Sequence, residues 1–431
     1  MRVLCTGDIH MGRRPTRLPS NVDTSTVSAA AVWNRVVDYA VTQQVDLVAL
    51  SGDIVDQDNR YYESLGPLEL GLRQLAKAGV QTVAVAGNHD YSVLPGLTRS
   101  LPKDSLHLLG VGGSWERKTI SGRDGAMLHV DGWSFPTQHV RDNPLSSYAL
   151  PIATDAPTLG LLHADLDQPQ SIYAPVSLGE LQARPMSMWL LGHVHAHALR
   201  TGYGKPPVLY PGSLQPLDPG EAGLHGAWLV ELSMSEDPTP RLIPMASVRY
   251  ETVEIDVSAA TAIDELRALL IGRIQETAGI FRSESSKVQH LSARVRLVGR
   301  SALHGKLDHE AIEMTDYLNR DLDDGGAAVY VERVEVAIRP DRDLTALAVG
   351  AGAEAYLARM LIGLERNDGL DEFVEILRSI DSIPVTLRGA KAYRSLADDP
   401  AQMGSAGLRV TLANEADRLL EQLLSQRAGA A

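Results

Sequence analysis

Several short segments of the sequence carry carboxylate, amide and imidazole side chains directly after apolar runs. The clearest is VAVAGNHDYS, residues 83–92, in which an apolar run ends at Asn88, His89 and Asp90. The same kinds of residue follow other apolar runs, at Asp8, His10, Asp53, His163, His193 and His195. Singly, each has a structural explanation, because Asp often caps helices, Asn often forms turns and a lone His is usually structural.

Taken together, these side chains predict a metal site. Burying so many polar groups without partners would cost about 2–7 kcal/mol each, and divalent cations remove that cost. The number of donors fits two cations better than one. Imidazoles and carboxylates suit Mn, Fe, Zn or Co, and no thiolate accompanies them to select Zn. In pairs such as Asp8/His10 and His193/His195, extended backbone would direct both side chains to the same side.

The elements that must position these residues are strands alternating with helices. The runs RVLCTG, VDLVALSG and QTVAVAG alternate with helical periodicity at about 28–43 and 64–78, which is typical of parallel βαβ units. Sites in such sheets form outside the carboxyl ends of the strands. A second series of short strands runs from GAMLHVDGWSF to GAWLVEL. We therefore expect residues 1–246 to form one domain, with two packed sheets and their loops on a shared rim.

The remainder of the chain predicts two further regions. Strand and helix patterns alternate over 247–340, which indicates a small α+β domain. Residues 341–431 read as helical, with amphipathic leucine-rich segments at about 354–380 and 413–427. These helices either form a bundle packed on itself or present a docking surface to a partner.

Composition narrows the class of protein. The 431 residues are 44% hydrophobic and 22% charged, which is ordinary for a globular protein. No apolar run approaches the roughly 20 residues of a membrane span, and the N-terminus does not read as a signal peptide. The single cysteine, Cys5, lies in a strand pattern where a buried residue is expected. We expect a cytoplasmic protein without membrane contact. The net charge of −14 argues against unaided nucleic-acid binding.

The motifs GDIH, SGDIVD, AGNHD, LLHAD and LGHVH, in that order over residues 7–195, resemble those of the calcineurin-like metallophosphoesterases. The resemblance implies an α/β fold, a four-layer α/β/β/α sandwich, with a dinuclear metal centre at its rim. One ion would be held by Asp8, His10, Asp53 and His195, and the other by Asp53, Asn88, His163 and His193. His89 would stabilise charge on phosphorus or protonate the leaving oxygen, and Asp90 would orient His89. A water between the ions would lose its proton and attack phosphorus.

Two longer segments resemble the DNA double-strand-break repair nucleases, the SbcD-type subunits. They are MRVLCTGDIHMG and the stretch from YPGS to LVEL. This resemblance implies a Mn-dependent DNA exo/endonuclease, with 247–340 as a capping domain. It also implies a homodimer and an SMC-like coiled-coil ATPase bound to the C-terminal helices. If the substrate is DNA, Arg13, Arg14 and Arg17 after the first motif would contact it; the alternative is that this stretch is a solvated loop.

Two departures from this pattern keep other functions open. Ala164 stands where a glycine is expected, and the loop at 217–221 is acidic and proline-rich where basic or polar residues would suit DNA. One alternative is a metallophosphoesterase that acts on a small nucleotide or another phosphoester. The other is a non-catalytic scaffold on the same fold, against which the complete ligand set and His89 argue.

Overall fold

The computed structural model describes residues 1–56, 61–102, 104–322, 328–366, 373, 375–376 and 405–429. Their contacts divide the chain into two compact units. One comprises Met1–Val253, Arg273–Val295 and Thr315–Arg333, and the other Glu254–Gly272, Arg296–Met314 and Val334–Ala431. The predicted domain boundaries after residues 246 and 340 remain predictions.

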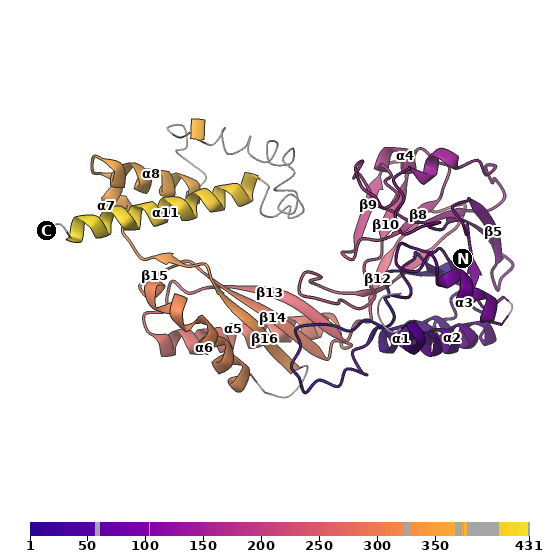
Figure 1. Ribbon diagram of the computed structural model, residues 1–431, viewed down its shortest axis with the longest axis horizontal. Helices are drawn as coiled ribbons and strands as arrows, with labels where there is room; N and C mark the ends of the chain where they lie inside the picture. The colour runs from indigo at the N-terminus through magenta and orange to yellow at the C-terminus, as the bar shows by residue number, and fades with distance from the viewer. Residues whose placement is uncertain are drawn as a thin grey trace. The chain divides into compact units, whose positions relative to one another are not determined.

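The first sheet, of which Figure 1 labels one strand, β12, holds the strands that carry the N-terminal motifs. Its order is β12 (Arg241–Pro244), β11 (Gly226–Glu231), β1 (Arg2–Thr6), β2 (Leu47–Leu50), β3 (Gln81–Ala84) and β4 (His107–Leu108). Strands β1 to β4 are parallel, as the βαβ pattern predicts, and β11 pairs antiparallel with β1. The carboxyl ends of β1, β2 and β3 therefore meet at one edge.

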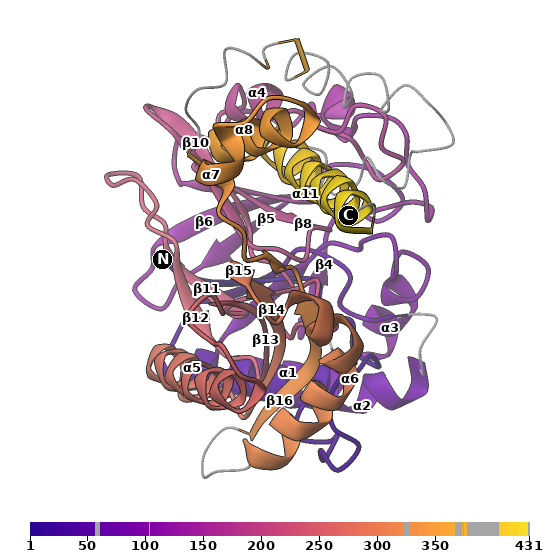
Figure 2. The ribbon, with the colours of Figure 1, turned by 90° about the vertical axis from the view of Figure 1, so that its left-hand side faces the viewer.

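The second sheet carries the histidines of the later motifs. Its order is β5 (Glu116–Ser121), β6 (Met127–Trp133), β7 (Thr158–His163), β8 (Met188–Gly192), β10 (Lys205–Tyr210) and β9 (Ala198–Gly202). Strands β6, β7, β8 and β10 are parallel, and β5 and β9 form antiparallel edges. In Figure 2, β5, β6 and β8 lie above β11 and β12 of the first sheet.

Side-chain alternation along the strands produces four layers. On β1, Val3 and Cys5 lie in the core between the sheets, whereas Leu4 lies in the core beneath the helices α1 (Ala29–Thr42) and α2 (Tyr61–Lys77). The outer face of the second sheet is covered in the same way, because Trp189 packs with Leu181 of α4 (Leu178–Gln182). The order helix, sheet, sheet, helix confirms the predicted sandwich, and Cys5 is buried as expected.

An α+β segment follows the sandwich. Strands β13 (Val248–Asp256), β14 (His290–Val298) and β16 (Ala328–Val336) form a sheet in that order. Helices α5 (Ile263–Glu284) and α6 (His304–Asp321) connect these strands in sequence. Burial alternates along much of β14, as its alternating sequence predicts for a strand with one covered face.

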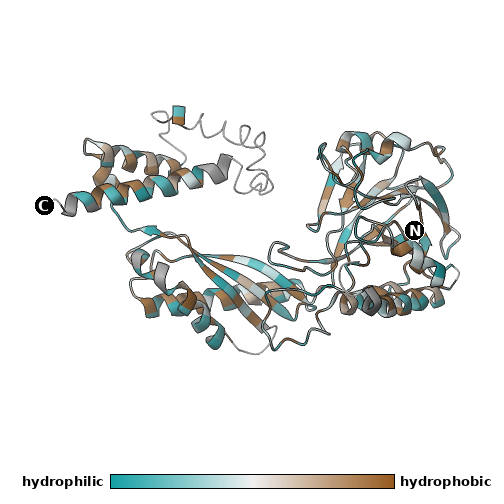
Figure 3. Cartoon of the chain, viewed as in Figure 1, coloured by the Kyte–Doolittle hydropathy of each residue, from teal (hydrophilic) through white to brown (hydrophobic). Residues whose placement is uncertain are grey.

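The C-terminal helices pack against one another. They are α7 (Leu344–Ala348), α8 (Ala353–Arg366) and α11 (Ser405–Gly429), and Leu344, Leu361 and Leu420 share a core. Figure 3 shows hydrophobic residues interspersed with hydrophilic ones along α8 and α11. The predicted helical segment at 354–380 coincides with α8 up to residue 366. Beyond that residue, most of the predicted segment lies outside the described residues. Among the helices that the structure describes, none combines the length and hydropathy of a membrane span.

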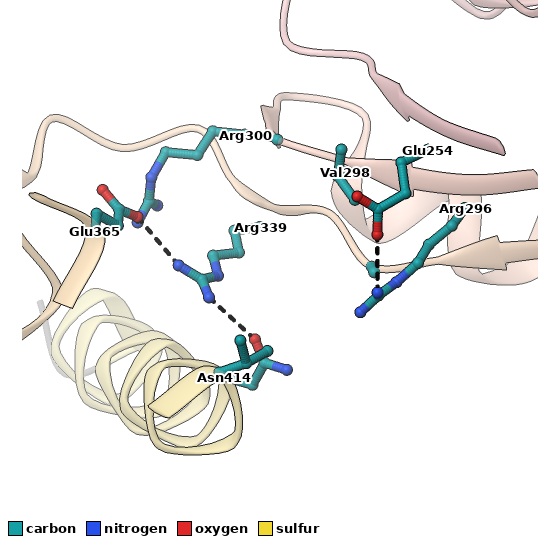
Figure 4. Close-up of a pocket in the computed structure, with 10 residues that line it drawn as sticks. Glu254, Arg296, Val298, Arg300, Arg339, Glu365 and Asn414 are labelled. Atoms are coloured by element: carbon teal, nitrogen blue, oxygen red, sulfur yellow. Dashed lines mark hydrogen bonds and ion pairs between the residues drawn. The ribbon is translucent and has the colours of Figure 1, made fainter. Parts of the chain in front are cut away.

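Two short strands, β15 (Arg300–Ser301) and β17 (Arg339–Pro340), connect to these helices through charged side chains. Arg300 and Arg339 pair with Glu365 of α8 at 2.6 and 3.1 Å. Arg339 also donates a hydrogen bond to Asn414 of α11 at 3.2 Å (Figure 4). These contacts fix both helices to the strand pair.

Candidate metal centre

The predicted ligands lie at the carboxyl ends of strands from both sheets. Asp8 and His10 follow β1, Asp53 follows β2, and Asn88 follows β3. From the second sheet, His163 is the last residue of β7, and His193 and His195 follow β8. All seven predicted ligands therefore come from the same rim of the sandwich.

Unusual backbone conformations direct several of these side chains. Asp8, His10 and Asp53 have φ angles of 45°, 48° and 48°, and His193 has a φ of 100°. Such left-handed conformations are uncommon for residues other than glycine and mark sites where the surrounding structure enforces them. The Asp8/His10 pair is thus brought together by turns beyond the end of β1. The alternation of an extended strand, expected from the sequence, is not the cause.

One group of donors surrounds His10 and His195. Their Nε2 atoms lie 3.0 Å apart. Asp8, His10 and His195 each offer a ligand atom, and these atoms all lie within 4.8 Å of one another. Asp53 Oδ2 lies 4.0 Å from His10 Nε2. This is the predicted first set of ligands.

The second group surrounds the side-chain oxygen of Asn88. Asn88 Oδ1 lies 3.0 Å from Nε2 of His163 and 3.2 Å from Nδ1 of His193. Asp53 Oδ2 lies 3.3 Å from the same nitrogen of His163. Asp53 therefore approaches both groups, as predicted for a bridging ligand. The assignment of individual ligands to individual ions remains a prediction.

The outward-facing nitrogen of each histidine lies near a further oxygen. The pairs are His163 Nδ1 with Ser51 O at 2.9 Å, His195 Nδ1 with Glu221 Oε1 at 2.8 Å, His193 Nε2 with Asp165 Oδ1 at 3.4 Å and His10 Nδ1 with Asp56 Oδ2 at 3.6 Å. Histidines that bind metals usually have their second nitrogen oriented by such a partner.

These contacts fit a centre of divalent cations. Because His163 donates its Nδ1 proton to Ser51 O, its neutral ring turns a lone pair toward the oxygens of Asn88 and Asp53. Two facing acceptors repel unless a proton or a cation lies between them. The Nε2 atoms of His10 and His195 also face each other, so two lone pairs there would repel unless a proton or a cation lay between them.

In metal-free protein, protons separate the facing acceptors, and the pKa values show which groups hold them. Burial opposes ionisation of Asp53, but the charges of His163 and the neighbouring imidazoles hold the pKa of its carboxyl far below the usual range. Burial likewise opposes protonation of His163, yet the Asp53 carboxylate raises its pKa to about 9. The pKa of His195 rises to about 8, despite burial, because of Glu221 and Asp8.

The two predicted catalytic residues occupy different environments. His89 is half-buried, and its ring meets that of His10 edge-on at 5.0 Å between centroids. Asp90 was expected to orient His89, but its carboxylate instead accepts backbone N–H groups of Gly87 and Ile54, both at 2.7 Å. Burial and the neighbouring Asp53 carboxylate raise the pKa of Asp90 to about 7. Any effect of Asp90 on His89 is therefore exerted through the backbone of this turn.

Sequence reasoning missed Glu221. It treated the segment 217–221 as an acidic loop unfavourable to DNA, yet Glu221 is only 9% exposed and faces His195. The signal that could have found it is its position shortly after the YPGS segment, in a loop that borders the site. Of the expected DNA contacts, Arg13 lies 3.6 Å from Asp56, Arg14 donates to Thr24, and Arg17 lies 3.7 Å from Glu332.

Two family models match parts of this chain. Residues 1–197 match the calcineurin-like phosphoesterase family, and residues 250–339 match the family described as metallophosphoesterase YhaO, middle domain. A relative from Bacillus subtilis (strain 168), "Uncharacterized metallophosphoesterase YhaO", is 25% identical over 264 residues. That match spans 61% of this chain and 62% of the relative. The finer resemblance to SbcD-type nucleases stays a prediction.

Solved structures show more distant similarity. The calcineurin-like phosphoesterase YfkN from Bacillus subtilis is 13% identical with a TM-score of 0.37, covering 65% of this chain and 98% of that one. A dimetal phosphatase from Danio rerio is 12% identical with a TM-score of 0.36, covering 57% and 99%. At these TM-scores the similarities carry no argument about function.

Proposed function

We propose that this chain, whose residues 1–197 match the calcineurin-like phosphoesterase family, is a two-metal phosphodiesterase that cleaves DNA. The match to that family supports phosphoester hydrolysis, and the DNA substrate is the finer part of the proposal. The observation that carries the proposal is the approach of Asp53 Oδ2 to both donor groups, at 3.3 Å from His163 Nε2 and 4.0 Å from His10 Nε2. This arrangement suits two cations that share one carboxylate.

The residues of the site have separable tasks. Two divalent cations bound here would supply an activated water and a positive clamp on the phosphate. Burial lowers the pKa of His89, although the Asp53 carboxylate opposes this shift. The His89 ring is consequently neutral near pH 7 and can donate an N–H hydrogen bond to a phosphate oxygen as negative charge develops. The backbone N–H of His89 donates to Asp53 Oδ1 at 2.9 Å, which fixes the turn beside the metal ligands.

We propose Mn as the native metal, with Fe, Zn and Co as alternatives. The donors are nitrogen and oxygen atoms, and the only thiol, Cys5, is buried in the core between the sheets. Such a donor set does not select strongly among these ions. Elemental analysis of protein purified without chelators, combined with turnover measured for each reconstituted metal, tests this assignment.

Arginines near the first motif support a polyanionic substrate. The Arg13 side chain is 37% exposed and lies beside Asp56, and that of Arg17 is 68% exposed beside Glu332. Asp56 and Glu332 themselves are only 3% and 9% exposed, but a guanidinium group has several N–H donors, so each arginine can keep its carboxylate partner and also donate to a phosphate. DNA would use both arginines, whereas a small nucleotide would need fewer contacts.

A hydrolysis panel with Mn²⁺ tests the proposal. The substrates are linear duplex DNA, single-stranded DNA, cyclic nucleotides and p-nitrophenyl phosphoesters. We expect DNA cleavage that Asp53→Asn abolishes and that R13A/R17A weakens with a reduced salt dependence. Arg73→Ala, which changes an exposed arginine paired with Glu69 on α2, is the matched control and should have no effect.

The other outcomes separate the alternatives. Hydrolysis of nucleotides without DNA cleavage would favour the small-nucleotide phosphoesterase. Bound metal with no turnover on any ester would favour the non-catalytic scaffold. Equal losses in R13A/R17A and in Arg73→Ala would remove the argument for arginine contacts to DNA.

We also propose that the C-terminal helices bind an SMC-like coiled-coil ATPase. The support is a groove of about 440 Å³ on α8 and α11, lined by Tyr356, Leu357, Leu419 and Leu423 among others. Leu419 is 45% exposed, which suits an apolar contact made by a partner. Leu419→Asp should abolish capture of the candidate ATPase, and Val349→Asp, at another exposed apolar position, should not. Retained capture by Leu419→Asp would exclude this surface.

A homodimer and a cytoplasmic location remain proposals from the sequence. Sedimentation at several protein concentrations tests the dimer. A single species at the monomer mass at every concentration would exclude it.

A further inference from the structure

Glu221 lies in the loop between β10 and β11 and receives hydrogen bonds from several directions. Its Oε1 lies 2.8 Å from His195 Nδ1. Its Oε2 accepts from the Ser213 hydroxyl at 2.6 Å and from the backbone N–H of Leu217 at 3.2 Å. Because its partners satisfy both oxygens, the buried carboxylate is held in one orientation.

The loop is itself fixed to the backbone of His195. Ser213 N–H donates to His195 O at 2.9 Å. Gly212 has a φ of 77°, and a Cβ there would lie 2.7 Å from His195 O, so only glycine allows this approach. His225 Nδ1 donates a hydrogen bond to the carbonyl oxygen of Ser213 at 2.8 Å, which also fixes this loop. Glu221 and His195 are therefore held relative to one another by backbone as well as by side chains.

The same loop is tied to two neighbouring segments. Leu217 O accepts the backbone N–H of Thr16, in the segment after the first motif, at 2.8 Å. Gly223 N–H donates to Tyr250 O of β13 at 3.0 Å. The Tyr250 hydroxyl in turn donates to Thr16 O. The support of Glu221 thus extends to the strand with which the YhaO middle-domain match begins.

We infer that Glu221 is a positioning residue that fixes the tautomer and ring orientation of His195. Its carboxylate accepts the Nδ1 proton, which leaves the Nε2 lone pair directed toward Asp8 and His10. The inference rests on the proposed metal centre, whose first ion His195 would bind.

The inference makes an asymmetric prediction for the two ions. His163, on the second ion, is oriented by the backbone carbonyl of Ser51, which no side-chain substitution removes. His195 depends on a replaceable carboxylate. Outer partners of metal-bound histidines typically change metal affinity about 10- to 100-fold. Substitution of Glu221 should therefore weaken the binding of one ion and leave the binding of the other unchanged.

The experiment is a Mn²⁺ titration of the metal-free full chain. Calorimetry measures the affinity of each ion, and electron paramagnetic resonance measures the coupling between the ions. We expect the wild type to bind two ions with the spectrum of a coupled pair. Glu221→Gln should bind one ion with unchanged affinity and the other about 10- to 100-fold more weakly, with an uncoupled Mn²⁺ spectrum at one equivalent. Glu332→Gln is the matched control, because Glu332 is also a buried carboxylate, paired with Arg294 at 2.5 Å.

Glu221→Asp guards against a folding defect. This variant keeps the negative charge, so it should partly restore the affinity for the more weakly bound ion. If Glu221→Gln binds two ions with wild-type affinity, the role of Glu221 is wrong and the proposed function stays intact. If Glu221→Gln does not fold, wild-type affinity for both ions in Glu221→Asp would likewise contradict the role of Glu221. A wild type that binds no Mn²⁺ would overturn both.

Discussion

The Oδ2 atom of Asp53 lies 3.3 Å from Nε2 of His163, and both side chains are buried. In metal-free protein this is an ion pair, because the pKa of Asp53 is far below its usual range and that of His163 is about 9. A proton on His163 thus occupies the space where a cation would bind. Protons and metal ions compete for the same donors.

We expect metal affinity to rise with pH. His163 and His195, with pKa values of about 9 and 8, each hold a proton at pH 7 that an incoming ion must displace. The affinity at each position should therefore increase by about tenfold per pH unit for each proton released. Calorimetry in buffers of different ionisation enthalpy measures both the affinity and the protons released. An affinity that does not vary between pH 6 and 8 would contradict the assigned ligands.

The stability of metal-free protein should show the opposite trend. The pKa of His163 is raised above the ordinary 6.5, so its contribution is complete below pH 6.5 and is lost as pH rises toward 9. The pKa of Asp53 is lowered from 3.8, so its contribution is present above that pH and is lost under more acidic conditions. Thermal unfolding in chelator should therefore show falling stability between pH 6.5 and 9. Excess Mn²⁺ should reverse that slope.

His89→Ala should separate chemistry from metal binding. The His89 ring faces that of His10 without a hydrogen bond to any of the described ligands, so its removal should leave both ions bound. A positioned acid or hydrogen-bond donor contributes roughly 10²–10⁴-fold to rate, and turnover should fall by that factor. Metal content and turnover are measured on the same preparation. Normal turnover, or loss of metal, would refute this role.

Asn88→Ala is the matched comparison for His89→Ala. It changes the preceding residue of the same turn, and it removes the oxygen near His163 and His193. We expect this variant to lose metal as well as activity. Wild-type metal content in Asn88→Ala would mean that Asn88 is not a ligand.

Much of the site could be predicted because its residues are fixed by strand order. Parallel strands bring Asp8, Asp53 and Asn88 to one edge, and each follows a recognisable apolar run. The left-handed turns that direct Asp8 and His10 were not predictable, since nothing in the residue types demands a positive φ there. Glu221 was missed because its partner is distant in sequence and its own loop lacks periodicity.

The fold shows a similar division. The alternation of strands and helices predicted the sheet of β1 to β4, and the side-chain alternation of β1 follows from the pleat. Pairing of β11 with β1 joins residues more than 200 positions apart, and the local sequence contains no signal for it. The same holds for Asp90, whose backbone partner Ile54 comes from the preceding motif.

Gly87→Ala should disrupt the centre by steric contact alone. A Cβ at Gly87 would lie 2.2 Å from Asp53 Oδ1 and 2.8 Å from His163 Cε1, so the pair would have to separate. Overpacking of this kind costs about 1–3 kcal/mol. We expect that loss of stability together with at least a tenfold fall in metal affinity. Urea denaturation and metal titration measure the two effects.

Gly272→Ala provides the control for that substitution. Gly272 lies in α5 with open space around its Cβ position, so alanine should stabilise the helix by about 0.5–1 kcal/mol without affecting metal binding. A similar change in metal affinity in both variants would exclude the steric explanation.

Asp90→Ala should destabilise the protein even without metal. Asp90 is fully buried, and its carboxylate satisfies the N–H groups of Gly87 and Ile54, both also buried. Each of the two buried donors left without an acceptor costs about 1–3 kcal/mol, so the free energy of unfolding should fall by about 2–6 kcal/mol. Asp124→Ala, at an exposed aspartate that accepts Ala126 N–H in a turn, should cost no more than about 0.5 kcal/mol. Urea denaturation in chelator compares them, and a loss below about 1 kcal/mol in Asp90→Ala would mean that water replaces the carboxylate as acceptor.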